Sequence, residues 1–472
     1  MLKSLFPVLL LLIASGAYSQ EHRTNLPEIK ISAGSYISSG NDLPFWMTSN
    51  QNGIFSFHDS SCQLLQLGFE KKMKEDPNKS WDYFYGSDFV YGYSGTASDF
   101  QFNQYWMGAR YKGVVLKAGA QPDPILYGGL SSTNGNMDWS NNSRPVPGIS
   151  LSTDGYIPFF FGKKWFSFKA LYAENLLNDK RFVDNVHLHH KSLIGRASLG
   201  TVKLSLGLDH WVYWGGTSPV YGKLPGFDNY FKYILGLKGG ANSPKNERTN
   251  ASGNSLGIYL LTVEKDFRNS RLTFYYNHPF EDRSGLEMEN IPDGLWGLHY
   301  GSKGEHFLSD FVYEFQNTLN QSGTYNMVEI GNTGRFTGRG NDNYFNNWIY
   351  KSGHVYYNRM MGSPFFLPVI DANGISKGFD NTRILLHHMG FSGWMNKSTT
   401  WKSLISWSRS FGTYDPEGVR YDPPLDQLSF LAECGFIFNK LPLRFIVGVA
   451  GDYGDRFEKR AGAYAGLSWK LN

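Results

Sequence analysis

The sequence predicts an all-β fold, a transmembrane outer-membrane β-barrel of about 18 antiparallel strands with long extracellular loops. Three observations support this prediction. Apolar and polar residues alternate along much of the chain, most clearly over 461–472, as they do when one strand face meets lipid and the other a wet lumen. Short and long connections between these segments alternate as well. Finally, the chain begins with the pattern of an export signal.

The first residues have the three parts of a secretory signal peptide. Lys3 precedes an apolar run over 5–13, and Ala17-Tyr18-Ser19 supplies the small-residue cleavage site before Gln20. We therefore assign 1–19 to a cleaved signal peptide and expect the protein in a bacterial outer membrane. Residues 20–57 lack a 3.6-residue period and remain open as a plug, an initial strand or periplasmic coil. Residues 58–472 are assigned to the barrel.

Composition narrows the class of protein. Aromatic residues make up 16% of the chain, glycine numbers 53 and charged residues are only 18%, a balance typical of aromatic girdles and glycine-rich turns. After the signal peptide, no stretch reaches the roughly 18 apolar residues of a membrane helix, which excludes helical membrane proteins. A net charge of +4 gives no case for nucleic-acid binding. On composition alone, a secreted β-sandwich or propeller remains the alternative.

Individual strands follow from the two-residue period. Clear alternation runs over 204–214, 114–121, 271–277 and 310–316. The polar positions include charged residues, as a water-filled or plugged lumen needs.

Two cysteines occur, Cys62 and Cys434. Cys434 falls in register with apolar residues over 428–438 and is placed on the lipid face. We expect two reduced thiols rather than a long-range disulfide.

Connection lengths assign the two ends of the barrel. Counted back from the last strand, 439–442 and 394–399 are short, whereas 411–426 and 361–381 are long. Since outer-membrane barrels have short periplasmic turns and longer outer loops, this parity predicts an exterior position for 121–147, 215–255, 278–292 and 361–381. One segment, 334–347, breaks the alternation by falling on the short side.

Three motifs that suggest chemistry have simpler readings. Gly253-Asn254-Ser255-Leu256-Gly257 matches a nucleophile elbow, but a loop precedes it and a strand pattern follows, where the motif needs a strand and then a helix. The histidines of 187–190 have no nearby cysteine or carboxylate in the sequence and are read as a lumen-lining or interfacial row. Glu281 and Asp282 are adjacent and point apart, so they cannot form a glycosidase pair. We expect no catalytic site, no metal and no cofactor.

The exterior segments also carry a set of residues suited to sugars. Aromatic faces stack on sugar rings, while amides, guanidinium groups and carboxylates hydrogen-bond to hydroxyls or acidic groups. The predicted polysaccharide-binding residues are Trp139, Asn141, Arg144, Trp214, Glu281, Asp282, Asp293 and Trp296. For any single residue the alternative is an aromatic girdle with polar loops, and for Asp293 a tight turn at Pro292-Asp293-Gly294.

Several segments together resemble a known family. In order, they are Trp139-Ser140-Asn141-Asn142-Ser143-Arg144-Pro145-Val146-Pro147-Gly148, Leu188-His189-His190-Lys191, Trp214-Gly215-Gly216, Pro279-Phe280-Glu281-Asp282-Arg283-Ser284-Gly285, Pro292-Asp293-Gly294-Leu295-Trp296-Gly297 and Asp342-Asn343-Tyr344-Phe345-Asn346-Asn347. The chain resembles the capsule-assembly (Wzi-type) outer-membrane family, in its Bacteroidetes-like branch. The resemblance implies an 18-stranded barrel that acts as a lectin and holds capsular or exopolysaccharide at the cell surface.

These observations lead to a non-enzymatic, lectin-like barrel that anchors or helps assemble surface polysaccharide. Its expected partners are that polysaccharide and outer-membrane lipid or lipopolysaccharide, without nucleic acid, and we expect a monomer. The alternatives are an outer-membrane channel or porin and a membrane-embedded enzyme that modifies glycan or lipid. An open lumen favours the channel and a plugged lumen favours the anchor.

Overall fold

The structure is a computed structural model. It describes residues 27–56, 58–76, 78, 80–159, 165–238, 252–281, 283–329, 334, 336–414, 418–438 and 441–471. The signal peptide and its cleavage site lie outside these residues. Among the described residues, no helix is both long enough and apolar enough to span a membrane.

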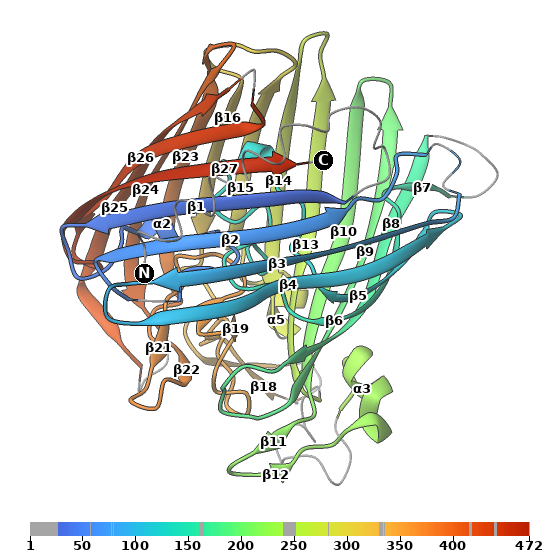
Figure 1. Cartoon of the computed structure of the whole chain (residues 1–472). Coiled ribbons are helices and arrows are strands. Elements are labelled where there is room, and N and C mark those ends of the chain that lie inside the picture. Colours follow the sequence, from blue (N-terminus) through green and yellow to red (C-terminus); the bar gives the residue numbers. More distant parts are fainter. Residues whose placement is uncertain are drawn as a thin grey trace.

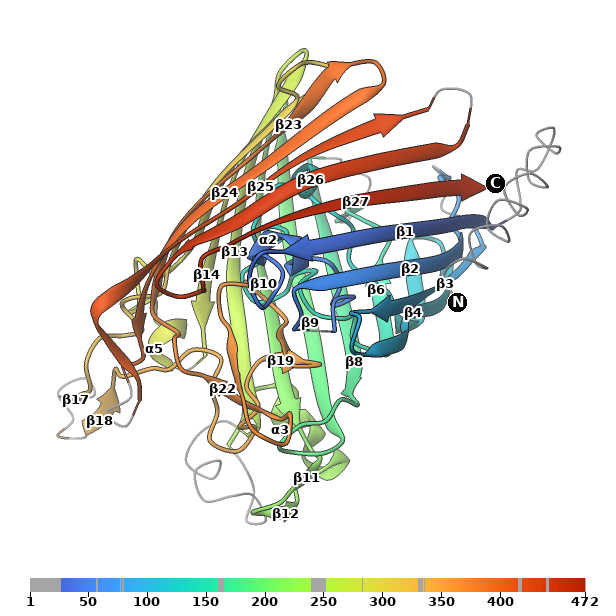
Figure 2. The same cartoon turned by 60° about the vertical axis from the view of Figure 1, so that its left-hand side comes forward.

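Eighteen antiparallel strands form one closed barrel (Figures 1 and 2). Neighbours in sequence are neighbours in the wall, and the barrel closes where β1 pairs with β27, from Ile29 opposite Leu471 to Ser38 opposite Gly462. One wall strand is interrupted, because β6 and β7 both pair with β8. Closure leaves no strand edge unpaired, which is the condition for crossing lipid with strands.

The wall strands are β1 (Glu28–Ser38), β2 (Ser61–Lys71), β3 (Asp82–Tyr93), β4 (Ser98–Tyr111), β5 (Val114–Ala120), β6 (Gly148–Thr153) with β7 (Ile157–Pro158), β8 (Phe166–Leu177), β9 (Val186–Leu199), β10 (Val202–Trp214), β13 (Asn254–Asp266), β14 (Ser270–Phe280), β15 (Gly294–Ser302), β16 (Asp310–Asn317), β23 (Ile384–Asn396), β24 (Thr399–Gly412), β25 (Arg420–Ile437), β26 (Leu443–Gly454) and β27 (Arg460–Leu471). The predicted last strand, 461–471, is confirmed with one added residue.

The remaining elements are short and lie in the connections. They are α2 (Phe45–Thr48), η1 (Tyr127–Gly129), β11 (Thr217–Ser218), β12 (Gly222–Lys223), η2 (Phe227–Asn229), α3 (Tyr230–Ile234), α5 (Arg283–Leu286), β17 (Asn326–Glu329), β18 (Phe336–Arg339), β19 (Val355–Tyr356), β20 (Arg359–Met360), β21 (Pro368–Ile370) and β22 (Ser376–Phe379).

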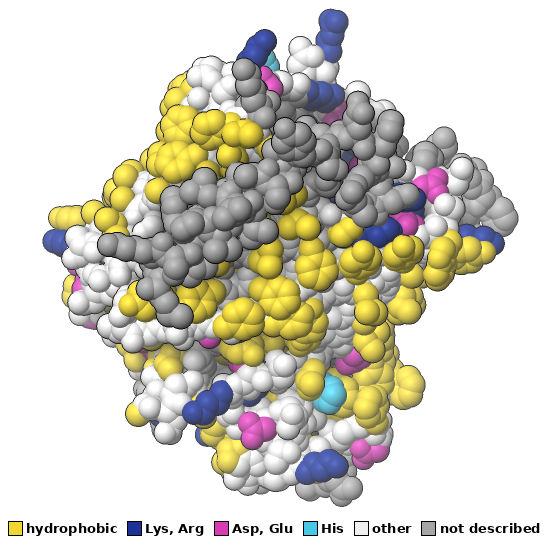
Figure 3. Space-filling view, in the orientation of Figure 1, with side chains coloured by type: hydrophobic (Ala, Val, Ile, Leu, Met, Phe, Trp, Pro, Cys, Tyr) yellow, Lys and Arg dark blue, Asp and Glu magenta, His cyan; other side chains and the backbone are white. Residues whose placement is uncertain are grey.

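The two faces of the wall follow the two-residue period. On β25, Leu428 and Phe430 are exposed on the outer face, whereas Ser429 and Leu431 are buried towards the lumen. Hydrophobic side chains accordingly cover much of the outer surface in Figure 3. Cys434 shares the outer face of β25, while Cys62 is buried, and both thiols are free.

The connections differ in length at the two ends of the barrel. One end, here called the turn end, carries only 72–81, 112–113, 159–165, 200–201, 267–269, 303–309, 397–398 and 438–442. The other, the loop end, carries 39–60, 94–97, 121–147, 178–185, 215–253, 281–293, 318–383, 413–419 and 455–459. Both termini of the wall, the start of β1 and the end of β27, lie at the turn end.

Two expectations about connections need correction. Residues 334–347 do not break the alternation, because β17 and β18 form a separate hairpin and all of 318–383 is one loop-end connection. The expected long loop at 411–426 shrinks to 413–419, since β24 and β25 continue pairing as far as Gly412 opposite Arg420.

Three loop-end segments fold back into the lumen: 39–56, 121–147 and 341–366. We call them the lumen plug. Their apolar side chains form a hydrophobic core, with Leu130, Met137, Phe345 and Phe366 almost fully buried. Residues 121–147 belong to the loop end, as the connection lengths predicted, but they fold into the barrel and are not exposed outside it.

Polar side chains of the wall hold the plug from several sides. Trp46 Nε1 donates to Ser406 Oγ on β24 (3.2 Å), and Phe45 N donates to Asp452 Oδ2 on β26 (3.0 Å). Further contacts reach β4, β10, β14, β16 and β23. Buried polar groups need partners, and the backbone and side chains of the plug supply them here. Many of the polar lumen positions seen in the sequence are therefore plug contacts.

Candidate functional site

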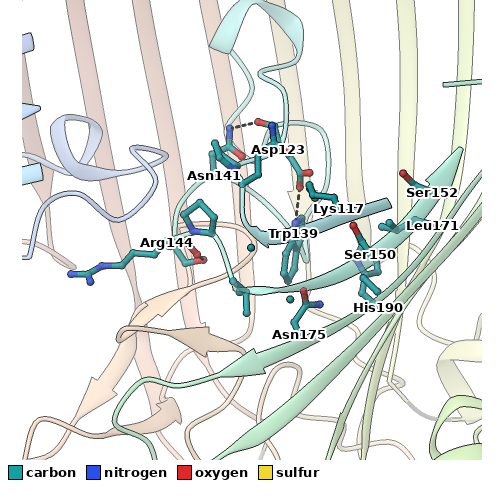
Figure 4. A pocket seen from close by; sticks show the side chains of 18 of the residues that line it. Lys117, Asp123, Trp139, Asn141, Arg144, Ser150, Ser152, Leu171, Asn175 and His190 are labelled. Carbon is teal, nitrogen blue, oxygen red and sulfur yellow. Dashed lines mark hydrogen bonds between the residues drawn. The ribbon is translucent and has the colours of Figure 1, made fainter. Parts of the chain in front are cut away.

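Three of the predicted residues line one inner cavity of about 220 Å³ between the plug and the wall strands β5, β6, β8 and β9 (Figure 4). They are Trp139, Asn141 and Arg144. Wall positions add hydroxyl and amide groups, such as Ser150 and Asn175. This cavity lies in the lumen and not on an exposed rim.

Trp139 is held in a fixed orientation. Its Nε1 donates to Asp123 Oδ2 (2.7 Å), which ties both ends of the 121–147 segment together. Its ring stacks on Trp211 of β10 with centroids 6.0 Å apart and lies 5.5 Å from His190. The indole therefore packs against the wall while it lines the cavity.

Asn141 and Arg144 join parts of the plug and wall. Asn52 N donates to the carbonyl of Asn141 (2.6 Å). The Arg144 guanidinium lies 4.1 Å from the Tyr357 ring centroid and 3.7 Å from Asp99 Oδ2. These contacts explain the inward fold of the segment, since each one links it to another part of the barrel.

The inner cavity carries charges of both signs. Lys117 and Lys169 line it from β5 and β8, and Asp123 lies beside Lys117 and Trp139 (Figure 4). Its volume of about 220 Å³ is below the roughly 300–1,000 Å³ of most ligand pockets, so it suits a small ligand rather than a polymer strand.

The other predicted residues do not join this cavity. Trp214 is buried on the outer face of β10, and its Nε1 donates to Glu174 Oε2 (3.3 Å). Glu281 Oε1 accepts from Phe345 N (2.6 Å). Trp296 stacks on Tyr276 of the neighbouring strand with centroids 3.9 Å apart. Asp282 lies outside the described residues.

Asp293 lies under the loop-end connections. Its carboxylate accepts hydrogen bonds from the backbone N–H groups of Asn320 (2.9 Å) and Gln321 (2.7 Å) and from the Tyr344 hydroxyl (3.0 Å). Burial raises the pKa of Asp293 to about 6, against the opposing effect of these donors. Its role is to fix the start of the 318–383 connection.

The raised pKa of Asp293 predicts a pH-dependent stability. The folded state binds this proton more tightly than the unfolded state, so the contribution is fully present below about pH 4 and is lost as pH rises through about 6. The pKa difference of about two units between the folded and unfolded states corresponds to roughly 3 kcal/mol of unfolding free energy. We expect the unfolding free energy of the wild type, minus that of Asp293→Asn, to fall by about this amount between pH 4 and 7 in urea titrations. Parallel pH profiles of the two proteins would contradict the assignment.

A second pocket, missed by the sequence prediction, lies at the loop end. This mouth pocket has a volume of about 780 Å³, within the usual range for ligand sites. It is lined from 178–185, 341–380 and 413–419, and its residues include Phe182, Trp348, Lys351, Asp371, Lys377 and Asp380.

The mouth pocket presents an aromatic face and charges of both signs, since Lys351 and Lys377 share its lining with Asp371 and Asp380. Trp348 is exposed, with its ring against Tyr221 at 5.6 Å. Lys351 and Lys377 are exposed as well. Asp380 is paired with Arg456 (3.0 Å). A stacking surface beside two ammonium groups is suited to an acidic sugar.

A signal for this pocket was present in the sequence. Trp348 and Lys351 follow the Asp342-Asn343-Tyr344-Phe345-Asn346-Asn347 segment directly. The asparagines of that segment shape the pocket, since Asn347 Oδ1 accepts from the backbone of Ile349 (2.9 Å) and Tyr350 (3.0 Å). The segment was placed on the short-turn side, which removed it from the predicted site.

Comparison with known proteins supports the fold. No protein-family model matches the chain, and no curated protein matches its sequence. The structure is similar to that of Wzi from Escherichia coli, described as an outer membrane protein involved in group 1 capsule assembly and a carbohydrate-binding β-barrel. The TM-score is 0.57 at 13% identity, covering 93% of this chain and 83% of Wzi.

Two Pseudomonas aeruginosa proteins are also similar. OccD3 matches with a TM-score of 0.47 at 9% identity, covering 95% of this chain and 92% of its own. The outer membrane protein OprD matches with a TM-score of 0.45 at 9% identity, over 97% of each chain. At these identities the likeness to Wzi shows the fold alone, an outer-membrane type of barrel.

Proposed function

We propose that this protein is a non-enzymatic bacterial outer-membrane lectin that holds acidic capsular or exopolysaccharide at the cell surface through its mouth pocket. In this proposal the loop end faces the exterior and the turn end the periplasm, as in barrels with short periplasmic turns. The exposed Trp348 beside Lys351 and Lys377 carries the proposal.

The lumen plug supports retention over passage. Its apolar core and its contacts with wall strands around the barrel place protein where a channel would need open space. The biochemical description of Wzi as carbohydrate binding agrees with the same reading. The enzyme alternative loses its motif, because Ser255 lies in β13 and no helix follows it.

Retention would come from many weak contacts. A polysaccharide offers the same acidic unit repeatedly, and many copies of the barrel lie in one membrane. Binding at one site then raises the effective concentration of the polymer at the next, so avidity replaces tight binding at a single pocket.

Deletion of the gene tests the proposal. We expect cell-bound polysaccharide to fall and polysaccharide in the medium to rise by the same amount, with both reversed by the wild-type gene. An unchanged distribution of polysaccharide, together with reduced uptake of a small solute, would favour the channel instead.

The inner cavity is the second candidate location for the same ligand, and two substitutions separate the sites. Trp139→Ala and Arg144→Ala remove packing contacts of the plug and are expected to cost about 1–3 kcal/mol of stability each. Polysaccharide retained per folded barrel, measured by heat-modifiability and cell-bound glycan on the same cells, should stay unchanged. A fall in this ratio would move the site to the inner cavity.

A further inference from the structure

Part of the 215–253 connection folds over the outside of the wall. η2 and α3 form a continuous helical stretch, Phe227 to Ile234, at the loop end (Figure 1). The Tyr230 hydroxyl donates to the Glu174 carboxylate on β8, and Lys191 Nζ on β9 donates to the carbonyl of Ile234. These contacts hold the stretch against β8, β9 and β10.

The covered wall residues lie on the outward face. On β10, Leu204 and Leu206 are exposed, and Val212 and Trp214 share their two-residue register, yet both are at most 1% exposed. The rings of Tyr230 and Tyr233 lie 5.4 Å and 5.8 Å from Trp214. The helical stretch is therefore what buries this part of the outer wall.

The covered patch is polar. His189 Nδ1 lies 2.6 Å from Glu174 Oε1, and Trp214 Nε1 donates to the other oxygen of the same carboxylate (3.3 Å). Polar and ionisable groups on the lipid face of a barrel are costly. Covering these groups with hydrogen-bonding tyrosines of the helical stretch removes that cost. The outer side of the helical stretch must then itself be compatible with lipid.

The outer side of the cover is apolar. Phe227, Phe231 and Leu235 follow one another at four-residue spacing, which places them on one side of a helix. They are 75%, 71% and 64% exposed, whereas Tyr233 between them is 1% exposed. Water would be a poor solvent for two exposed phenylalanines and a leucine in one row.

This apolar row continues the lipid-facing wall. Leu176, Leu193 and Leu206 lie on the outward faces of β8, β9 and β10 and are 38%, 59% and 58% exposed. Hydrophobic side chains run along this edge of the molecule in Figure 3. Lys232 lies within the helical stretch and Lys238 follows it, as cations do in helices at a membrane surface.

We propose that 227–237 is a membrane foot, in which Phe227, Phe231 and Leu235 insert into the acyl-chain region of the leaflet at the loop end. Its ligand is lipid, because the row is continuous with the wall that already meets lipid. The foot shields the polar patch at Glu174 and His189, and it fixes how deep the loop end lies in the membrane.

Nitroxide accessibility tests this proposal. Phe231→Cys is made in a Cys62→Ala, Cys434→Ala background, since both native thiols are free, and the labelled barrel is placed in liposomes. Collisions with oxygen, which concentrates among acyl chains, are compared with collisions with a water-soluble nickel chelate. Phe227→Cys and Leu235→Cys repeat the measurement if the first variant does not fold.

Two matched positions calibrate the result. Leu206→Cys reports lipid in mid-wall, and Tyr221→Cys reports water at the mouth pocket, where Tyr221 meets Trp348. We expect the oxygen-to-nickel ratio at 231 to be several-fold higher than at 221 and close to that at 206. A ratio equal to that at 221 would overturn the foot. A label shielded from both reagents would overturn it too, because a protein surface would then cover the row.

Discussion

Replacing Glu314 by alanine is expected to turn an electrically silent barrel into a conducting one. Glu314 on β16 is fully buried and accepts hydrogen bonds from Ser131 Oγ (2.5 Å), Ser132 N (2.6 Å) and the Tyr275 hydroxyl (2.6 Å). Two of these donors belong to the plug segment 121–147. Losing the carboxylate leaves three buried donors without their acceptor, which costs roughly 3–5 kcal/mol.

The expected consequence is local because the wall strands keep their own pairing. The plug segment should detach from β16 while the barrel remains folded, and water and ions should then enter the lumen. Conductance of purified protein in planar bilayers measures this directly, with the wild type as the closed reference.

Glu433→Ala is the matched control. Glu433 also faces the lumen, but its partners Tyr464 and Lys402 lie on wall strands and not on the plug. The Glu433→Ala barrel should conduct no more than the wild type. A folded Glu314→Ala barrel that does not conduct would show that this carboxylate does not hold the plug. Conductance by the wild type would show that the lumen is not plugged.

Removing the aromatic face and the positive charge of the mouth pocket is expected to release polysaccharide from cells. Trp348→Ala and the pair Lys351→Gln with Lys377→Gln each remove about 1–3 kcal/mol of contact. One polymer is held by many barrels at once, so a small loss of affinity at each site is multiplied along the polymer. The fraction of cell-bound polysaccharide should therefore fall by more than the loss of affinity at one site. The amount of folded barrel should not change, since all three side chains are exposed.

Two controls define this effect. Trp348→Phe keeps a stacking face and should restore most of the retention. Lys397→Gln removes one lysine charge in the same way at the turn end, in the 397–398 connection, and should have no effect. Equal retention in all variants, per folded barrel, would exclude the mouth pocket as the site.

The sequence predicted the wall well because strand faces follow a strict period of two. Leu428 and Phe430 were placed outward from that period alone, and the last strand was located within one residue. The same period cannot tell whether an inward residue meets water or protein. An inward glutamate such as Glu314 fits the two-residue period equally well in an open channel and in a plugged barrel. The sequence therefore did not decide whether the lumen is plugged.

The candidate site was less predictable for a related reason. Trp139, Trp214 and Trp296 look alike in sequence, yet their positions differ. Trp139 lines the inner cavity, Trp214 lies under α3, and Trp296 stacks on Tyr276 on the outer wall. Those positions depend on where long connections fold, and such segments have no period. The 318–383 connection contains three short hairpins that imitate wall strands, and the prediction accordingly counted 334–347 among the short connections.

Direct binding of polysaccharide to the purified barrel tests the central claim. The protein is immobilised in lipid nanodiscs, and surface polysaccharide purified from its own cells is applied before and after chemical reduction of its carboxyl groups to alcohols. The account predicts saturable binding that weakens as salt is raised, because exposed charges are screened, and that is largely lost with the reduced polymer. Absence of binding by the native polymer at low salt, with a correctly folded barrel, would contradict it.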